Sequence, residues 1–243
     1  MNRKLTLIAG VAALVAGGAL IYTGAGTGPA TQVTLPQDPA ATEAPDNQTA
    51  DAGRASDADD VDTGLVVDMV LGDPDAPVTI IEFSSLTCPH CATFNQGVYR
   101  QIMAEYVDTG QVRFIKREVF FDAPGLWAAL VARCGGPERY HGIIEMIYED
   151  QRRWAGAGDG TSVANELRRI GRRAGLDNDQ LDACLSDRDM ATALMAVYQQ
   201  NAEEFGIRST PGFVINGELH GNMSFAEFQT AIAAATEAAA AAQ

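Results

Sequence analysis

Residues 78–91 read Val-Thr-Ile-Ile-Glu-Phe-Ser-Ser-Leu-Thr-Cys-Pro-His-Cys, an apolar run that leads directly into two cysteines two residues apart. The nearly continuous apolar run at 78–83 predicts a strand that is buried on both faces. A helix is expected from residue 89 to about residue 108, and a second strand at 112–119. A β-α-β unit of this length predicts two parallel neighbouring strands joined by a right-handed connection.

The sequence on either side of this unit continues the alternation of strands and helices. An opening strand is expected at 65–70, closed by the turn-forming residues 72–77. Five later stretches have apolar residues spaced near 3.6 and predict helices at 126–134, 138–149, 162–174, 177–185 and 190–205. A strand is expected at 212–216, with Asn216-Gly217 as a hairpin turn, and a last helix begins at the cap Ser224.

The first 63 residues predict export and not a folded domain. Residues 1–25 have a positive start and then a charge-free apolar run, which fits a cleaved signal peptide and a retained N-terminal membrane anchor equally well. Residues 26–63 are rich in Ala, Pro, Thr and Asp without apolar periodicity, and they predict a disordered acidic linker. The folded domain is therefore expected at 64–243, with a helical insertion at about 122–205.

The charge balance argues against one class of partner. The chain has 17 Lys and Arg against 32 Asp and Glu, which gives a net charge of -15. A surface that binds phosphate groups needs clustered Lys and Arg side chains. Nucleic acid is therefore not an expected partner.

The two cysteines at the junction of the predicted strand and helix have a specific chemistry. Cys88 would occupy the N-cap, where unpaired backbone N–H groups and the positive end of the helix dipole stabilise a thiolate. Pro89 suits the first helical position, and a protonated His90 would add positive charge near the sulfur. A stable thiolate leaves easily, so the Cys88–Cys91 disulfide is predicted to be reactive and oxidising. Cys91, one turn inside the helix, is expected to be shielded and to act as the resolving thiol.

Two other uses of the cysteine pair are less well supported by the sequence. A pair with this spacing is often half of a zinc site, but structural zinc needs four ligands. The chain has three histidines, His90, His141 and His220, and no second pair at that spacing, so no metal site is expected. A purely structural Cys88–Cys91 disulfide would close too small a loop to stabilise the fold much.

Taken together, these residues resemble the DsbA family, whose members have a thioredoxin fold and donate disulfides in the bacterial periplasm. The resemblance covers about 65–233 and rests on the strand at 80–83, the dithiol sequence Thr87-Cys88-Pro89-His90-Cys91, a helical insertion, and Ser-Thr-Pro-Gly-Phe-Val-Ile-Asn-Gly at 209–217. It implies an α/β, thioredoxin-like fold, in which helices flank a central mixed sheet and an all-helical subdomain is inserted.

The resemblance assigns a role to the Thr210-Pro211 loop. An X-Pro bond adopts the cis form at modest cost, and in thioredoxin-like proteins this loop lies beside the dithiol. By resemblance, Pro211 is the family's cis-proline, and Thr210 offers its backbone to an extended substrate segment. The alternative is an ordinary proline that opens a strand.

Two charged residues interrupt the predicted apolar strands. Glu82 lies six residues before Cys88, and Lys116 lies in the neighbouring strand. A buried carboxylate is costly unless it is paired or protonated. Their positions resemble those of the charged pair beneath the family's dithiol, so we expect Glu82 and Lys116 to tune the thiols and to assist proton transfer. The alternative is a charge at a strand end that reaches solvent.

The other two cysteines, Cys134 and Cys184, fall within the predicted helical insertion. An exported location favours a structural disulfide between them over two free thiols. The best-known family members lack this pair, although some relatives carry an extra bridge. In the same region, Trp127, Tyr148 and Trp154 are expected to be core residues of the insertion, with a peptide-binding surface as the alternative.

The leading functional prediction is a thiol:disulfide oxidase of the periplasm that passes its disulfide to reduced or unfolded exported proteins. By resemblance, a DsbB-like membrane oxidant would restore the Cys88–Cys91 disulfide, and no cofactor beyond that disulfide is expected. A disulfide isomerase or reductase is a nearby alternative. A periplasmic copper-binding chaperone that uses Cys88, Cys91 and His90 is an alternative from another class, because thiolates suit Cu(I).

Overall fold

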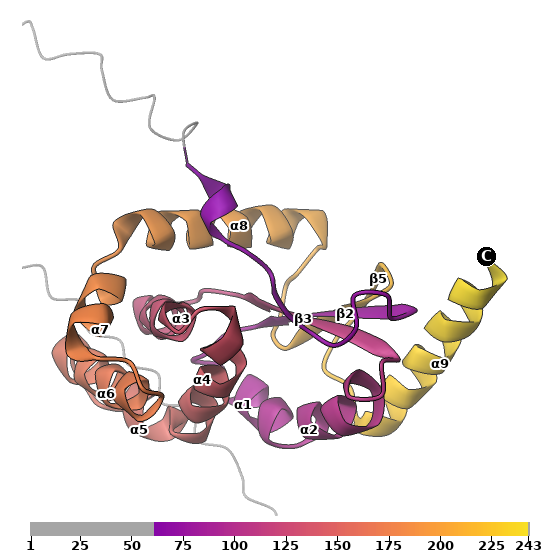
Figure 1. The fold of residues 1–243 in the computed structure, drawn as a ribbon, viewed down its shortest axis with the longest axis horizontal. Helices are drawn as coiled ribbons and strands as arrows, with labels where there is room; N and C mark the ends of the chain where they lie inside the picture. The colour runs from indigo at the N-terminus through magenta and orange to yellow at the C-terminus, as the bar shows by residue number, and fades with distance from the viewer. Residues whose placement is uncertain (1–60, 243) are drawn as a thin grey trace, which may run out of the picture. The chain divides into compact units, whose positions relative to one another are not determined.

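A computed structural model describes residues 61–242. The predicted export segment and all but the end of the predicted linker lie outside these residues. Five strands form one sheet in the order β1-β3-β2-β4-β5 (Figure 1). Their bounds are β1 (Met69–Leu71), β2 (Val78–Ser84), β3 (Val112–Glu118), β4 (Gly212–Ile215) and β5 (Glu218–His220). Strands β2 and β3 are parallel and the other neighbours are antiparallel, which confirms the predicted mixed sheet.

Helices occupy most of the rest of the described chain. They are η1 (Thr63–Leu65), α1 (Pro89–Gln96), α2 (Val98–Ile102), the π-helical turn η2 (Met103–Val107), α3 (Ala123–Cys134), α4 (Pro137–Glu149), α5 (Gln151–Ala155), α6 (Gly160–Arg173), α7 (Asn178–Leu185), α8 (Arg188–Glu204) and α9 (Phe225–Ala241). None of these helices, all within 61–242, has the length and apolar character needed to cross a bilayer.

Two predicted elements differ from the structure, and one helix was not predicted. The strand predicted at 65–70 begins only at Met69, because Asp62 caps the short helix η1 through the Gly64 N–H and the following residues do not pair with the sheet. The helix predicted at 89–108 is interrupted at Gly97, whose φ of -121° and ψ of -91° are not helical. The short helix α5 was not predicted at all, since five residues carry too little periodicity to be recognised.

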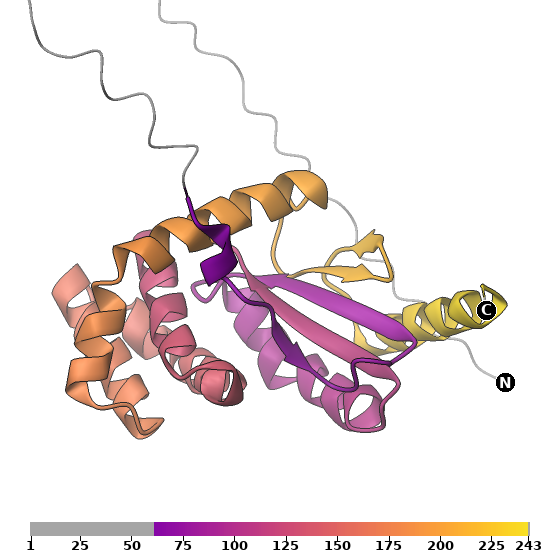
Figure 2. The ribbon, with the colours of Figure 1, turned by 45° about the horizontal axis from the view of Figure 1, so that its top comes forward.

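Two apolar layers cover the two faces of the sheet. Helices α1, α2 and α9 pack on one face, while α8 runs along the other (Figures 1 and 2). On the first face the Phe213 ring of β4 lies 4.7 Å from Phe94 of α1 and 4.8 Å from Phe228 of α9, measured between ring centroids. On the second face Phe83 of β2 meets Phe205, just beyond α8, at 5.4 Å.

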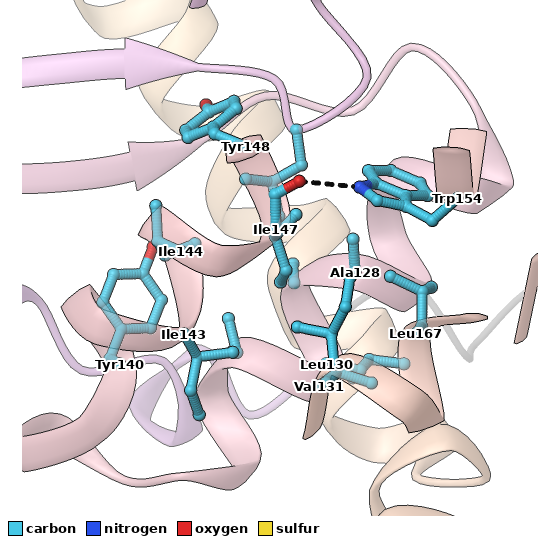
Figure 3. Close-up of a cluster of buried hydrophobic side chains, with 14 of the residues drawn as sticks. Ala128, Leu130, Val131, Tyr140, Ile143, Ile144, Ile147, Tyr148, Trp154 and Leu167 are labelled. Carbon is cyan, nitrogen blue, oxygen red and sulfur yellow. Dashed lines mark hydrogen bonds between the residues drawn. The ribbon is translucent and has the colours of Figure 1, made fainter. Parts of the chain in front are cut away.

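The helical insertion between β3 and β4 supplies most of one core cluster (Figure 3), which also includes Met69 of β1 and Cys91 and Ala92 of α1. Trp154 is fully buried there, and its indole N–H donates to the Ile147 carbonyl at 2.8 Å. Tyr148 is also buried, while Trp127 is half-buried against the same cluster. The prediction that these aromatic residues belong to the core of the insertion is therefore confirmed for Trp154 and Tyr148 and holds partly for Trp127.

Local sequence signals at the C-terminal end are confirmed. Asn216 and Gly217 both have positive φ, 44° and 93°, as the tight turn between β4 and β5 requires. The Asn216 side chain accepts from the Thr79 N–H at 2.8 Å and so ties the turn to β2. Ser224 caps α9 together with Glu227 in a capping box.

Candidate active site

The dithiol lies at the junction of β2 and α1, as the sequence predicted. Cys88 is the N-cap of α1, with an extended backbone at φ -78° and ψ 121°, and Pro89 is the first helical residue. Cys88 is half-buried, Cys91 is fully buried, and both are free thiols. Pro89 and His90 are exposed between them. A thiol of another molecule can therefore approach Cys88 but not Cys91.

The surroundings of Cys88 favour its thiolate. Burial by itself would raise the pKa of the Cys88 thiol, but hydrogen bonds from the Thr210 side chain, the Cys91 backbone and thiol, and the His90 backbone outweigh it. The net pKa of Cys88 is lower than that of an ordinary cysteine. A lowered pKa makes Cys88 a good leaving group in disulfide exchange.

The surroundings of Cys91 have the opposite effect. Burial raises the pKa of the Cys91 thiol far above its usual range, and the negative charges of Glu82 and of the Cys88 thiolate raise it further. Cys91 therefore stays protonated when Cys88 is ionised. The two sulfurs at the start of α1 are thus chemically distinct, and Cys88 is the one suited to react with a thiol or disulfide of another molecule.

The predicted proline loop lies directly beside the reactive sulfur. The Thr210-Pro211 bond is cis, and the Cys88 thiol donates to the Thr210 carbonyl at 3.6 Å across 122 residues of sequence. Pro211 is buried, whereas Thr210 keeps part of its surface exposed. The loop thus lies next to Cys88, and the pairing of its backbone with an extended substrate segment stays a prediction.

Glu82 and Lys116 form an ion pair in the sheet beneath the dithiol. They are direct neighbours on the parallel strands β2 and β3, and the Lys116 ammonium group donates to Glu82. The Lys116 Nζ atom also lies 4.0 Å from the centroid of the Tyr99 ring. Their side chains are 0% and 2% exposed, so the alternative in which a charge reaches solvent is wrong. Their part in proton transfer stays a prediction.

The sequence and the fold are similar to those of known proteins. The family model described as Thioredoxin matches residues 65–234, which is more than half of the chain. The chain belongs to the thioredoxin family. Among solved structures, Wolbachia pipientis alpha-DsbA1 superposes on this thioredoxin-family chain with a TM-score of 0.65 and 27% identity, covering 74% of this chain and 98% of that one. The resemblance to DsbA proteins and the predicted thioredoxin-like fold with a helical insertion are confirmed.

Curated relatives carry names that agree with this assignment. The Rickettsia felis protein named "Putative protein-disulfide oxidoreductase" is 31% identical over 176 residues, which are 70% of this chain and 60% of that protein. A Rickettsia conorii protein with the same kind of name is 29% identical over 171 residues, or 70% and 61% of the two chains. This thioredoxin-family chain thus spans about three fifths of the length of the curated relatives it matches.

Two polar contacts around the thioredoxin-family dithiol were not predicted. The Thr87 hydroxyl donates to Asp122 at 2.8 Å, and the same Asp122 side chain caps α3 through the Gly125 N–H. The sequence Asp122-Ala-Pro is a recognisable helix start, so it could have identified Asp122 as a cap. It gives no sign that Asp122 also binds Thr87. The other contact comes from Gln151, which donates to backbone carbonyls around Cys88 and has no sequence signal.

The remaining cysteines and histidines lie in other parts of the domain. Cys134 at the end of α3 is disulfide-bonded to Cys184 in α7, across 50 residues of sequence. His141 is buried in α4 beside Tyr140, and His220 is in β5. Within residues 61–242, no three His, Cys, Asp or Glu side chains are gathered as they would be around a metal ion.

Proposed function

We propose that this protein is a thiol:disulfide oxidoreductase that introduces disulfide bonds into exported proteins through the Cys88–Cys91 pair. The observation that carries the proposal is the contrast between the two sulfurs. Cys88 is accessible and its pKa is lowered, whereas Cys91 is buried and its pKa is raised. Such a pair reacts with outside thiols at one sulfur only, which is what ordered donation of a disulfide requires.

The reaction is a two-electron exchange among four sulfur atoms. A client thiolate attacks the Cys88 sulfur of the disulfide, the Cys88–Cys91 bond breaks, and Cys91 leaves and takes up a proton. A second client thiolate then attacks the client sulfur of this mixed disulfide, and Cys88 leaves as a thiolate. The client is oxidised to a disulfide and the protein is reduced to a dithiol, so no further cofactor is needed.

The different ionisation of the two cysteines favours transfer of the disulfide to the client over re-formation of the Cys88–Cys91 disulfide. Re-formation of the Cys88–Cys91 disulfide requires Cys91 to attack the mixed disulfide, and only a thiolate attacks well. Because burial and the Glu82 charge keep Cys91 protonated, the mixed disulfide persists until the second client thiol reacts. Donation is therefore the favoured direction for clients that have two free cysteines.

The substrate class follows from the loop beside Cys88. The Thr210 backbone next to the cis bond suits an extended peptide segment, which a reduced and still unfolded protein provides. The proposed setting is the periplasm, where a DsbB-like membrane oxidant would restore the disulfide, and where the N-terminal segment would be a cleaved signal or an anchor.

The test is oxidation of a reduced, unfolded client by the full chain in its disulfide form. We expect stoichiometric transfer of one disulfide per protein molecule and its loss in Cys88→Ser. The variant Cys134→Ala/Cys184→Ala, assayed at a temperature where it is folded, is the matched control and should still transfer one disulfide. Absence of transfer by the wild-type chain would overturn the proposal.

Two further measurements separate the alternative functions. Reactivation of a client with scrambled disulfides, combined with failure to oxidise a reduced one, would identify an isomerase or reductase. Stoichiometric, tight copper binding by the reduced protein, combined with a reduction potential close to that of thioredoxin, would identify the copper-binding alternative. The proposed oxidase is expected to have an oxidising potential against glutathione.

A further inference from the structure

A glutamine of the helical insertion binds the backbone of the turn that carries Cys88. Gln151 is the first residue of α5, and its Nε2 group donates to the Leu86 carbonyl at 2.8 Å and to the Cys88 carbonyl at 3.0 Å. The Gln151 side chain is 6% exposed, so these are buried hydrogen bonds. One amide group thus holds both sides of the turn, more than sixty residues away in sequence.

These two bonds satisfy groups that need a partner. Leu86 is buried, and within residues 61–242 its carbonyl has no other hydrogen-bond donor. The Cys88 carbonyl also accepts a hydrogen bond from the Ala92 N–H of α1 at 3.2 Å. A buried carbonyl without a donor costs free energy, so loss of the Gln151 amide would drive the turn to rearrange.

The position of the Cys88 backbone matters because the sulfur depends on donors just beyond it. The backbone N–H groups of His90 and Cys91, at the start of α1, help to lower the pKa of the Cys88 thiol. They stabilise charge on the sulfur only while Cys88 keeps its extended N-cap conformation ahead of Pro89. A turn that is free to move would point the same sulfur away from the end of the helix.

We propose that Gln151 is a positioning residue of the redox site, which fixes the Leu86–Cys88 turn so that the first N–H groups of α1 face the Cys88 sulfur. Gln151 itself contacts neither a client nor a reacting sulfur. Its importance for disulfide donation rests on the proposed function, but its effect on Cys88 does not. Through this contact, the inserted helical subdomain adjusts the chemistry of the dithiol.

A neighbouring glutamine provides a matched control. Gln96 of α1 donates through Nε2 to the Tyr148 carbonyl at 3.1 Å, at the end of α4 and close to Gln151 in sequence. It too joins α1 to the helical insertion, but its partner is not part of the Cys88 turn. Removing its amide therefore tests for a general loosening of the contact between α1 and the insertion.

The experiment compares Gln151→Met and Gln96→Met in the reduced full chain. Methionine keeps the length of the side chain and removes the donors. The pKa of Cys88 is measured from the ultraviolet absorbance of the thiolate, and the equilibrium constant with glutathione from the disulfide fraction. For Gln151→Met we expect the Cys88 pKa to rise and the disulfide to become less oxidising by about 2- to 10-fold in that constant. Gln96→Met should leave both values at those of the wild type.

Two outcomes would overturn the proposal: an unchanged Cys88 pKa in folded Gln151→Met, or an equal rise in Gln96→Met. If Gln151→Met does not fold, Gln151→Asn is compared with Gln96→Asn, since asparagine keeps the amide but draws it back by one methylene group. The Cys88 pKa is again expected to rise in the variant at position 151 and to stay unchanged in the variant at position 96. The Cys88 titration requires no client, so it can fail or succeed independently of the disulfide-transfer assay that tests the proposed function.

Discussion

Lys116 binds Glu82 across the parallel strands β3 and β2, and both side chains are closed off from solvent. The Lys116 ammonium group is further held against the face of the Tyr99 ring. One Glu82 oxygen, Oε1, has no hydrogen-bond partner within residues 61–242. Since the Glu82 charge also helps to keep Cys91 protonated, this pair links the interior of the sheet to the resolving thiol.

Replacement of Glu82 by Gln should change both stability and thiol chemistry. Without the Glu82 charge the pKa of Cys91 should fall, because a neighbouring negative charge no longer opposes its ionisation. The buried Lys116 is left without its partner, which should cost about 3–5 kcal/mol of unfolding free energy. Urea unfolding gives the stability, and the carbon chemical shifts of labelled cysteines followed with pH give both thiol pKa values.

The double variant Glu82→Gln/Lys116→Met separates the two effects. It removes both charges, so most of the lost stability should return while the Cys91 pKa stays lower than in the wild type. If Glu82→Gln leaves the Cys88 and Cys91 pKa values and the exchange rate unchanged, the pair has no role in tuning the dithiol.

A second buried ion pair should anchor the helical insertion to the sheet. The Arg133 guanidinium of α3 binds both oxygens of Glu118 at the end of β3, at 2.8 Å and 2.7 Å, and Tyr140 of α4 donates to the same carboxylate at 2.9 Å. Arg133→Met should lower the unfolding free energy by about 3–5 kcal/mol, because it leaves a buried carboxylate unpaired.

The matched control for this pair is Tyr140→Phe, which removes one hydrogen bond and keeps the ring. It should cost about 1.5–3 kcal/mol, since the bond is made to a charged group. Chemical denaturation measures both variants. Equal losses, or a smaller loss for Arg133→Met, would mean that the ion pair does not hold the insertion in place.

The Cys134–Cys184 disulfide should stabilise the fold without taking part in exchange. It bridges 50 residues, for which chain entropy predicts a contribution of about 4 kcal/mol. Cys134→Ala/Cys184→Ala should lose up to that amount in urea unfolding. Under mild reduction followed by alkylation, Cys88 and Cys91 should be labelled before Cys134 and Cys184. Simultaneous labelling of all four would instead indicate a second redox-active pair.

The buried His141 should make the protein sensitive to acid. Burial, and then the nearby Lys116 charge, lower the pKa of His141 to about 4, and neither ring nitrogen has a hydrogen-bond partner within residues 61–242. The unfolded chain has a histidine pKa near 6.5 and so binds the proton first as the pH falls. Stability from this group is therefore complete above about pH 6.5 and is lost between about pH 6.5 and 4, on the order of 3 kcal/mol.

His141→Leu tests this origin of acid sensitivity. Leucine has a similar size and no polar atoms, so stability at neutral pH should be equal to or greater than that of the wild type. The fall in unfolding free energy between about pH 6.5 and 4 should be reduced. A variant that loses stability with pH as steeply as the wild type would exclude His141 as the cause.

The local parts of the site followed from sequence because each depends on neighbouring residues. The apolar run of β2 and the adjoining Cys88-Pro89-His90-Cys91 predicted a strand, a helix start and a thiolate at the N-cap, and the structure has all the elements in that order. The Asn216-Gly217 turn and the Ser224 cap were found for the same reason. In contrast, the break at Gly97 and the short helix α5 depend on packing and were missed.

By itself, the sequence determined which residues form β2 and α1 and that the paired cysteines lie at their junction, since hydrophobic period and capping act within a few residues. Only the tertiary structure decided which distant groups surround the sulfurs. The Thr210 carbonyl and the Gln151 amide reach Cys88 across 122 and 63 residues, and Lys116 meets Glu82 through strand register. These contacts depend on how strands and helices pack against one another, which no local pattern encodes. The same packing buries Cys91 near the Glu82 charge and leaves Cys88 partly exposed, so the two cysteines differ in their chemistry.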